Sequence, residues 1–131
     1  MVEIYLSSSC KSCQKARSWL NNHRVSYQEH DIFRQVLSVE VLRHILSKTD
    51  NGTHDIISTH SKIFQSLCVD DLDSLSVNEL LALIKKYPSL LRRPIIFDDK
   101  RLQIGFNKED IRVFLPQDYR RVEMKVSKEE T

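Results

Sequence analysis

The sequence predicts an α/β protein in which a mixed four-stranded sheet carries an inserted helical subdomain. Three observations support this prediction. A short apolar run at 2–6 leads into a helical pattern, the middle of the chain has helical spacing, and short strand patterns return near the end. A β–α–β half and a β–β–α half around helices is the plan of a thioredoxin-like fold. The expected divisions are a core at 1–32 and 91–116, an insert at 33–90 and a flexible charged tail at 117–131.

The first part of the chain predicts a β–α–β unit. Val2, Ile4 and Leu6 alternate on one face of a strand, and 11–22 has the spacing of an amphipathic helix. A short second strand is expected at 25–27. Because a helix connects the two strands, we expect them to pair in parallel through a right-handed crossover.

Capping residues mark the helices of the insert. Ser38 precedes one apolar stripe, and Ser76 with Glu79 forms a capping box for a helix that must end before Pro88. Gly52 stands in a turn signal, where a helix C-cap or a tight turn requires a positive φ. The insert also contains a short helical segment at 61–67, whose expected buried residues are Ile63, Phe64 and Leu67.

The chain then returns to strands. An apolar run at 95–97 and an alternating run at 102–104 flank a tight turn, so they predict a β-hairpin. Asn107 is a plausible cap for a last helix, which Pro116 ends.

The motif that carries chemistry is Cys10-Lys11-Ser12-Cys13, at the junction of the first strand and the first helix. A helix N-terminus presents unpaired N–H groups and the positive end of the helix dipole, which favour a thiolate and predict a lowered pKa for Cys10. Cys13 lies one turn further in, on the buried face, close enough to attack an oxidised Cys10. The motif in this position predicts a redox-active dithiol.

Two other interpretations of the motif are weaker. A zinc site needs a second pair of ligands, but the only other cysteine is Cys68 and the five histidines lack paired spacings. We therefore expect no metal and no other cofactor, and a buried apolar role for Cys68. A structural disulfide requires an oxidising compartment, and the N-terminus has no pattern of an export signal.

The composition is that of an ordinary globular domain, with 131 residues of which 40% are hydrophobic and 29% charged. No apolar run approaches the ~18 residues of a membrane span. The few cysteines and the missing export-signal pattern lead us to expect a cytoplasmic protein. We also expect it to be a monomer. A net charge of +2 is too small to indicate nucleic-acid binding. A basic cluster near the hairpin is interpreted as a solvated face, which promoter DNA meets only within a larger complex; it comprises Arg92, Arg93, Lys100 and Arg101.

Several motifs together resemble the Spx family within the arsenate-reductase-like (ArsC) group. The first is Ser-x-Ser-Cys-x-Ser-Cys-x-Lys-Ala-Arg at 7–17. The others lie, in the same order as in the family, at 51–59, 61–65, 90–96, 98–103 and 112–116. The resemblance covers residues 1 to about 116 and leaves the tail outside it.

The resemblance implies a bacterial global transcriptional regulator rather than an enzyme. Such proteins bind the C-terminal domain of the RNA polymerase α subunit and respond to thiol stress through a disulfide, here Cys10–Cys13. Gly52 matches a position on the polymerase-binding surface. Arg92 matches an arginine near the dithiol that supports the oxidised state, and Pro94 stands where a cis-proline faces the motif. A protease adaptor is a further partner that the resemblance implies.

The main departure from the family pattern is His60, which replaces a common arginine. We interpret it as a solvated loop histidine rather than a pH switch. The rival hypothesis is a thiol-disulfide oxidoreductase or an arsenate reductase, in which Arg92 and Arg93 hold an oxyanion beside the cysteine. His60 removes one basic group from such a site. In the regulator hypothesis, the two arginines donate to serines around the motif once the disulfide has formed.

Overall fold

A computed structural model describes residues 1–35, 37–67 and 72–115. Its sheet has the strand order β2-β1-β3-β4, with β1 (Val2–Leu6) parallel to β2 (Tyr27–Asp31). The other two strands, β3 (Ile95–Phe97) and β4 (Leu102–Ile104), pair antiparallel. The predicted mixed four-stranded sheet is confirmed.

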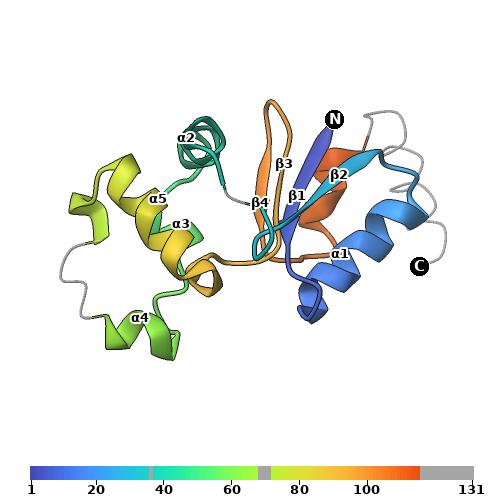
Figure 1. Cartoon of the computed structure of the whole chain (residues 1–131). Coiled ribbons are helices and arrows are strands. Elements are labelled where there is room, and N and C mark those ends of the chain that lie inside the picture. The colour runs from blue at the N-terminus through green and yellow to red at the C-terminus, as the bar shows by residue number, and fades with distance from the viewer. Residues whose placement is uncertain (36, 68–71, 116–131) are drawn as a thin grey trace.

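The helices divide between the two faces of the sheet. The long helix α1 (Lys11–Asn22) and the 3₁₀-helix η3 (Asp110–Phe114) lie on one side, and the helices between β2 and β3 lie on the other (Figure 1). That second group comprises α2 (Val39–Ser47), α3 (Thr53–Ile56), α4 (Lys62–Ser66), η1 (Leu72–Ser74), α5 (Val77–Lys86) and η2 (Pro88–Leu90). None of the described helices is long and apolar enough to cross a bilayer.

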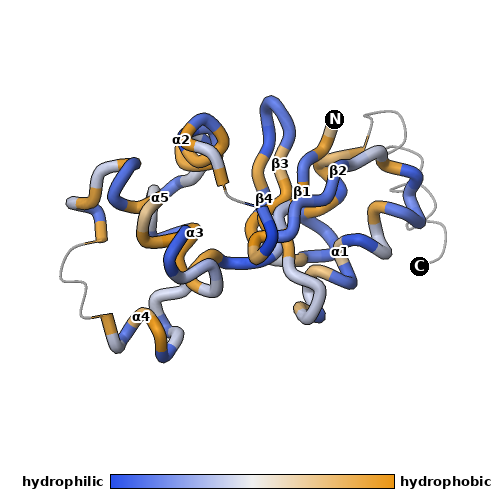
Figure 2. The backbone as a smooth tube through the Cα atoms, in the orientation of Figure 1, coloured by the Kyte–Doolittle hydropathy of each residue, from blue (hydrophilic) through white to orange (hydrophobic). Residues whose placement is uncertain are grey.

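Two hydrophobic clusters fill the space on either side of β1. Ile4 is fully buried against α1 and η3, whereas its neighbour Tyr5 is buried against the helices of the insert. Alternate residues of a strand point to opposite faces, so one strand contributes to both clusters. Figure 2 shows hydrophobic β3 in the centre of the molecule and the hydrophilic β3–β4 turn projecting from the sheet. One hydrophobic cluster contains residues of both the sheet and the insert, so the two parts share a core. The assignment of the insert as a separate subdomain stays a prediction.

The predicted caps are confirmed. The Ser38 hydroxyl accepts the N–H of Val41 at 3.1 Å, and Ser76 with Glu79 forms a reciprocal capping box. Gly52 has a φ of 66°, as expected, but it precedes α3 instead of ending a helix.

The predicted last helix is present as a 3₁₀-helix, and Asn107 lies at its start, accepting the N–H of Glu109 at 2.9 Å. Two local predictions are wrong. The second strand begins at Tyr27, because the chain is still turning at Arg24, which has a φ of 55°. Ile63 in α4 is 40% exposed, whereas Phe64 and Leu67 are half-buried against the insert core. The predictions for Cys68, Pro116 and the tail fall outside the described residues.

The capping box provides a test of how α5 is anchored. Replacing Ser76 by alanine removes the acceptor for the Glu79 N–H and should lower the free energy of unfolding by about 1 kcal/mol. Urea denaturation of the purified protein measures this change. The matched control is Asn78→Ala, exposed in the same turn, which should change stability by less than about 0.5 kcal/mol. Equal losses in the two variants would contradict the capping assignment.

Candidate functional site

The two cysteines of the motif are joined by the first turn of α1. Cys10 is the N-cap residue, and its sulfur accepts the backbone N–H of Cys13 at 3.3 Å. Both residues are free thiols. The sulfur of Cys10 therefore occupies the position in which a serine or aspartate oxygen usually caps a helix. The strand–motif–helix arrangement expected from the sequence is confirmed.

The two thiols differ in exposure. Cys10 is half-buried, whereas Cys13 is 1% exposed and packs in the cluster between α1 and the sheet. Burial raises the pKa of Cys13 to about 12, and the hydrogen bond with Cys10 acts in the same direction. The Ser7 backbone and the charge of Arg93 act against this rise without cancelling it. Cys13 is therefore a protonated, protected thiol at neutral pH.

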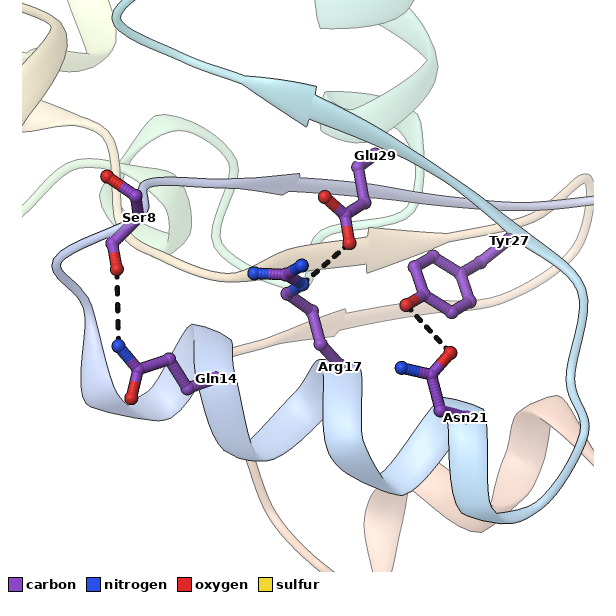
Figure 3. Close-up of polar contacts among 6 residues, drawn as sticks. All are labelled: Ser8, Gln14, Arg17, Asn21, Tyr27 and Glu29. Carbon is purple, nitrogen blue, oxygen red and sulfur yellow. Dashed lines mark hydrogen bonds and ion pairs between the residues drawn. The ribbon is translucent and has the colours of Figure 1, made fainter.

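Polar contacts hold α1 in place along its length (Figure 3). Near its start, the Gln14 side-chain amide donates to the Ser8 carbonyl at 3.2 Å. In the middle, Arg17 forms an ion pair with Glu29 of β2 at 2.6 Å. These contacts join the helix that carries the dithiol to both the preceding loop and the neighbouring strand.

Cys10 opens onto a cavity of about 490 Å³ that also includes Arg92, Arg93 and His60 in its lining. The lining also includes the hydroxyl-bearing Ser58 and Ser89. His60 is exposed, in agreement with its interpretation as a solvated residue, and it lies at the same cavity as the reactive cysteine.

The two arginines have different partners. Arg93 Nη1 donates to the hydroxyl of buried Ser7 at 3.0 Å, and its guanidinium lies 5.7 Å from the centre of the Phe33 ring. Arg92 Nε donates to the Ile57 carbonyl at 3.2 Å, so this arginine is bonded to the insert. Arg93 already contacts Ser7 beside free thiols, and the contacts of the two arginines after disulfide formation stay a prediction.

Arg93 and Ser7 are site residues to which the sequence pattern gave too little weight. The motif pattern drew attention to Arg92, but Arg93 is the arginine whose charge acts on Cys13. The next residue, Pro94, is buried, and the peptide bond between them is cis. The role of Pro94 beside the dithiol stays a prediction.

The Gly52 loop is held by a carboxylate that the sequence did not single out. Asp55 accepts the backbone N–H groups of Asn51 at 2.9 Å and Asp50 at 3.0 Å. The Asn51 N–H is the main cause that lowers the pKa of Asp55. Gly52 itself has a φ of 66° and a ψ of −131°, and a Cβ built on it would meet nothing within 4 Å. The loop is therefore ordered by Asp55 and open to solvent at Gly52.

Arg92 connects this loop region to the dithiol cavity. Its backbone N–H donates to the Ile56 carbonyl at 2.8 Å, at the end of the helix that Gly52 begins. Its side chain lines the cavity of Cys10. One residue thus contacts both regions that the sequence associates with function, although Gly52 is not a cavity residue.

Two further expectations concern metals and the basic cluster. Within the described ranges, no group of three or more His, Cys, Asp or Glu side chains is arranged to hold a metal ion. Three residues of the basic cluster donate hydrogen bonds to other groups of the protein. Arg101 Nη1 donates to the Val113 carbonyl, and Arg92 and Arg93 donate to Ile57 and Ser7 as described above.

Fold and site together define a dithiol protein of the thioredoxin-like class. The ArsC family model matches residues 5–114. The chain is 60% identical over 124 residues to the global transcriptional regulator Spx 1 of Lactococcus lactis, covering 95% of this chain and 96% of that protein. It is 61% identical to Spx of Streptococcus mutans, covering 95% of this chain and 90% of the relative. The chain belongs to the ArsC family and, within it, to the Spx family.

A structure that is named as an enzyme has the same fold. The structure of an arsenate reductase from Vibrio cholerae superimposes with a TM-score of 0.72 at 22% identity, covering 87% of this chain and 97% of that one. This similarity shows the fold alone. The close relatives are named as transcriptional regulators and not as enzymes.

The difference in exposure predicts unequal reactivity of the thiols. In a Cys10→Ser variant, alkylation of Cys13 by iodoacetamide should stay slow and should still accelerate at pH 10, because burial, the largest cause of its raised pKa, remains. An ordinary thiol reaches its full rate soon above its pKa of ~8.5. Peptide mapping by mass spectrometry follows each cysteine separately. The control is the Cys13→Ser variant, in which Cys10 should react faster at pH 7.5. A plateau for Cys13 near pH 9 would contradict the assignment.

Proposed function

We propose that this chain is a global transcriptional regulator that binds the C-terminal domain of the RNA polymerase α subunit and is switched by a Cys10–Cys13 disulfide. The observation that carries the proposal is the asymmetric dithiol, with a half-buried cysteine capping a fixed helix and a protected thiol one turn inside. Membership of the Spx family supports the regulatory role. The expected setting is the bacterial cytoplasm, with the protein acting as a monomer.

The switch is a two-electron oxidation for which hydrogen peroxide suffices. The Cys10 thiolate attacks one peroxide oxygen, the O–O bond breaks, and a sulfenic acid and hydroxide are formed. The Cys13 sulfur then attacks the Cys10 sulfur, the S–O bond breaks, and the departing hydroxide takes the Cys13 proton as water. The high pKa of Cys13 keeps it protonated until this step, which protects it from oxidation on its own.

Disulfide formation changes the start of α1. The bond brings the two Cβ atoms to ~3.8 Å and removes the Cys10 sulfur from its position as acceptor of the Cys13 N–H. Because contacts along α1 hold the rest of the helix, the first turn and the Ser7 loop must absorb the change. Arg93 is bonded to Ser7 and Arg92 to the end of α3, so these residues are the route by which the change reaches the insert.

The proposed polymerase-binding surface includes the Gly52 loop and the turn around the dithiol. Asp55 orders the loop before any partner binds, which lowers the conformational entropy lost on association. Arg92 and Pro94 are proposed to support the oxidised form. Promoter DNA is met within the polymerase complex, and a protease adaptor is a further proposed partner.

The decisive experiment measures binding of the purified protein to the isolated C-terminal domain of the polymerase α subunit. Diamide-oxidised protein should bind about tenfold more tightly than dithiothreitol-reduced protein, a typical coupling between two sites. The gain should be lost in both Cys10→Ala and Cys13→Ala. Equal affinity in the two redox states would contradict the switch, and absence of binding in either state would contradict the regulator as proposed.

Gly52 provides a separate test of the binding surface. Both Gly52→Ala and Gly52→Arg place a side chain at a positive φ, which should cost about 1–3 kcal/mol of stability in each. Only the arginine extends into the solvent where the partner is proposed to bind. We therefore expect Gly52→Arg to lose binding and Gly52→Ala to retain most of it, measured by titration with the same polymerase domain. Equal affinities would remove Gly52 from the surface.

One observation favours a second candidate function, an oxyanion reductase. Arg92 and Arg93 line the cavity of Cys10, as a bound arsenate would require. Against this function, the close relatives are named as transcriptional regulators, and each arginine already gives one N–H group to Ser7 or Ile57. Arsenate reduction assayed with glutathione should show no turnover, and steady turnover abolished by Cys10→Ala would favour the enzyme.

A further inference from the structure

A groove on α1 shares no lining residue with the cavity of Cys10. It has a volume of about 560 Å³ and runs between one face of the helix and the connection from β4 to η3. Trp19, which is 7% exposed, and Phe106 are its aromatic members. The remaining lining residues are Lys11, Gln14, Lys15, Ser18, Asn22 and Lys108.

The groove is positively charged and has basic residues on both walls. Lys11 and Lys15 are one turn apart on α1, about 6 Å along the helix, and Lys108 comes from the opposite wall. No Asp or Glu is present in α1 or in the lining of the groove. In the part of the chain that the structure describes, none of the three lysines forms an ion pair.

The segment that carries Lys108 has a defined position. The Asn107 side-chain oxygen accepts the N–H groups of Glu109 at 2.9 Å and Asp110 at 3.1 Å, and the Gln103 amide donates to the Asn107 carbonyl at 3.3 Å. The two acidic residues that follow Lys108 are exposed but do not line the groove. Both walls are therefore preformed, and the only charges between them are positive.

We propose that this groove binds the phosphate backbone of duplex DNA. The proposal rests on the regulatory function above, in which polymerase brings the chain close to a promoter. Lysine, glutamine, serine and asparagine side chains are the usual donors to DNA phosphates, and these types make up the polar lining of the groove. Such contacts position a protein without reading sequence, so the groove adds affinity and orientation while polymerase supplies the site.

The composition of the groove favours DNA over an acidic protein partner. Protein interfaces are centred on desolvated aromatic or aliphatic anchors and are depleted in lysine. Here Trp19, the largest aromatic residue, is 7% exposed, and every charged side chain that lines the groove is a lysine. In the basic cluster near the hairpin, by contrast, Arg92, Arg93 and Arg101 each use one N–H group for a hydrogen bond within the protein.

The test compares two triple variants with the same loss of charge. The groove variant is Lys11→Gln, Lys15→Gln and Lys108→Gln; the matched control is Lys48→Gln, Lys85→Gln and Lys86→Gln, which lies outside the groove. Fluorescence anisotropy with a labelled 30-bp duplex gives the affinity of the full chain as a function of salt. The groove variant should lose on the order of tenfold in affinity at 50 mM salt, and its salt slope should fall by about 3, one unit per phosphate contact. The control should stay close to the unmodified protein.

Three outcomes would overturn the proposal. Equal losses in both variants would mean that only the overall charge matters, and unchanged binding in the groove variant would exclude the groove. Equal loss of binding to polyglutamate and to the duplex in the groove variant would indicate an acidic protein as the partner. Binding of each variant to the polymerase domain is measured in parallel. If the unmodified protein does not bind that domain, the regulatory function fails whatever the DNA result.

Discussion

Burial of β1 on both faces is the constraint on which the rest of the structure depends. Ile4 faces α1 and Tyr5 faces the insert, so the dithiol helix and the Gly52 loop belong to clusters that share one strand. A strand covered on both sides cannot shift its register by one residue without exchanging the two clusters. The positions of the motif at one end of β1 and of the insert on its other face are fixed by this packing.

The dithiol is controlled by unequal environments. The same helical turn leaves Cys10 at a cavity and encloses Cys13 in the core, where burial is the largest cause of the raised pKa of Cys13. Arg93 and Ser7 add a polar contact on one side, and Arg92 bonds the segment before β3 to the end of α3. Two hydrogen bonds near the dithiol thus connect separate parts of the chain. One joins Arg93 to Ser7, beside the motif, and the other joins Arg92 to Ile57, at the end of the helix that Gly52 begins.

The same fold serves reductases and regulators, so the fold does not choose between them. What favours a regulator here is the close similarity to Spx proteins.

The sequence by itself determined the features that depend on local pattern. Strand alternation, the Ser38 and Ser76 caps, the positive φ at Gly52 and the placement of the CxxC motif all follow from residues close in sequence. Only the tertiary structure decided the position of β2, whose start depends on a turn at Arg24 and on pairing with β1. The engagement of Arg93 with Ser7 was decided in the same way, because those residues are 86 positions apart and meet only when β1 and β3 pair.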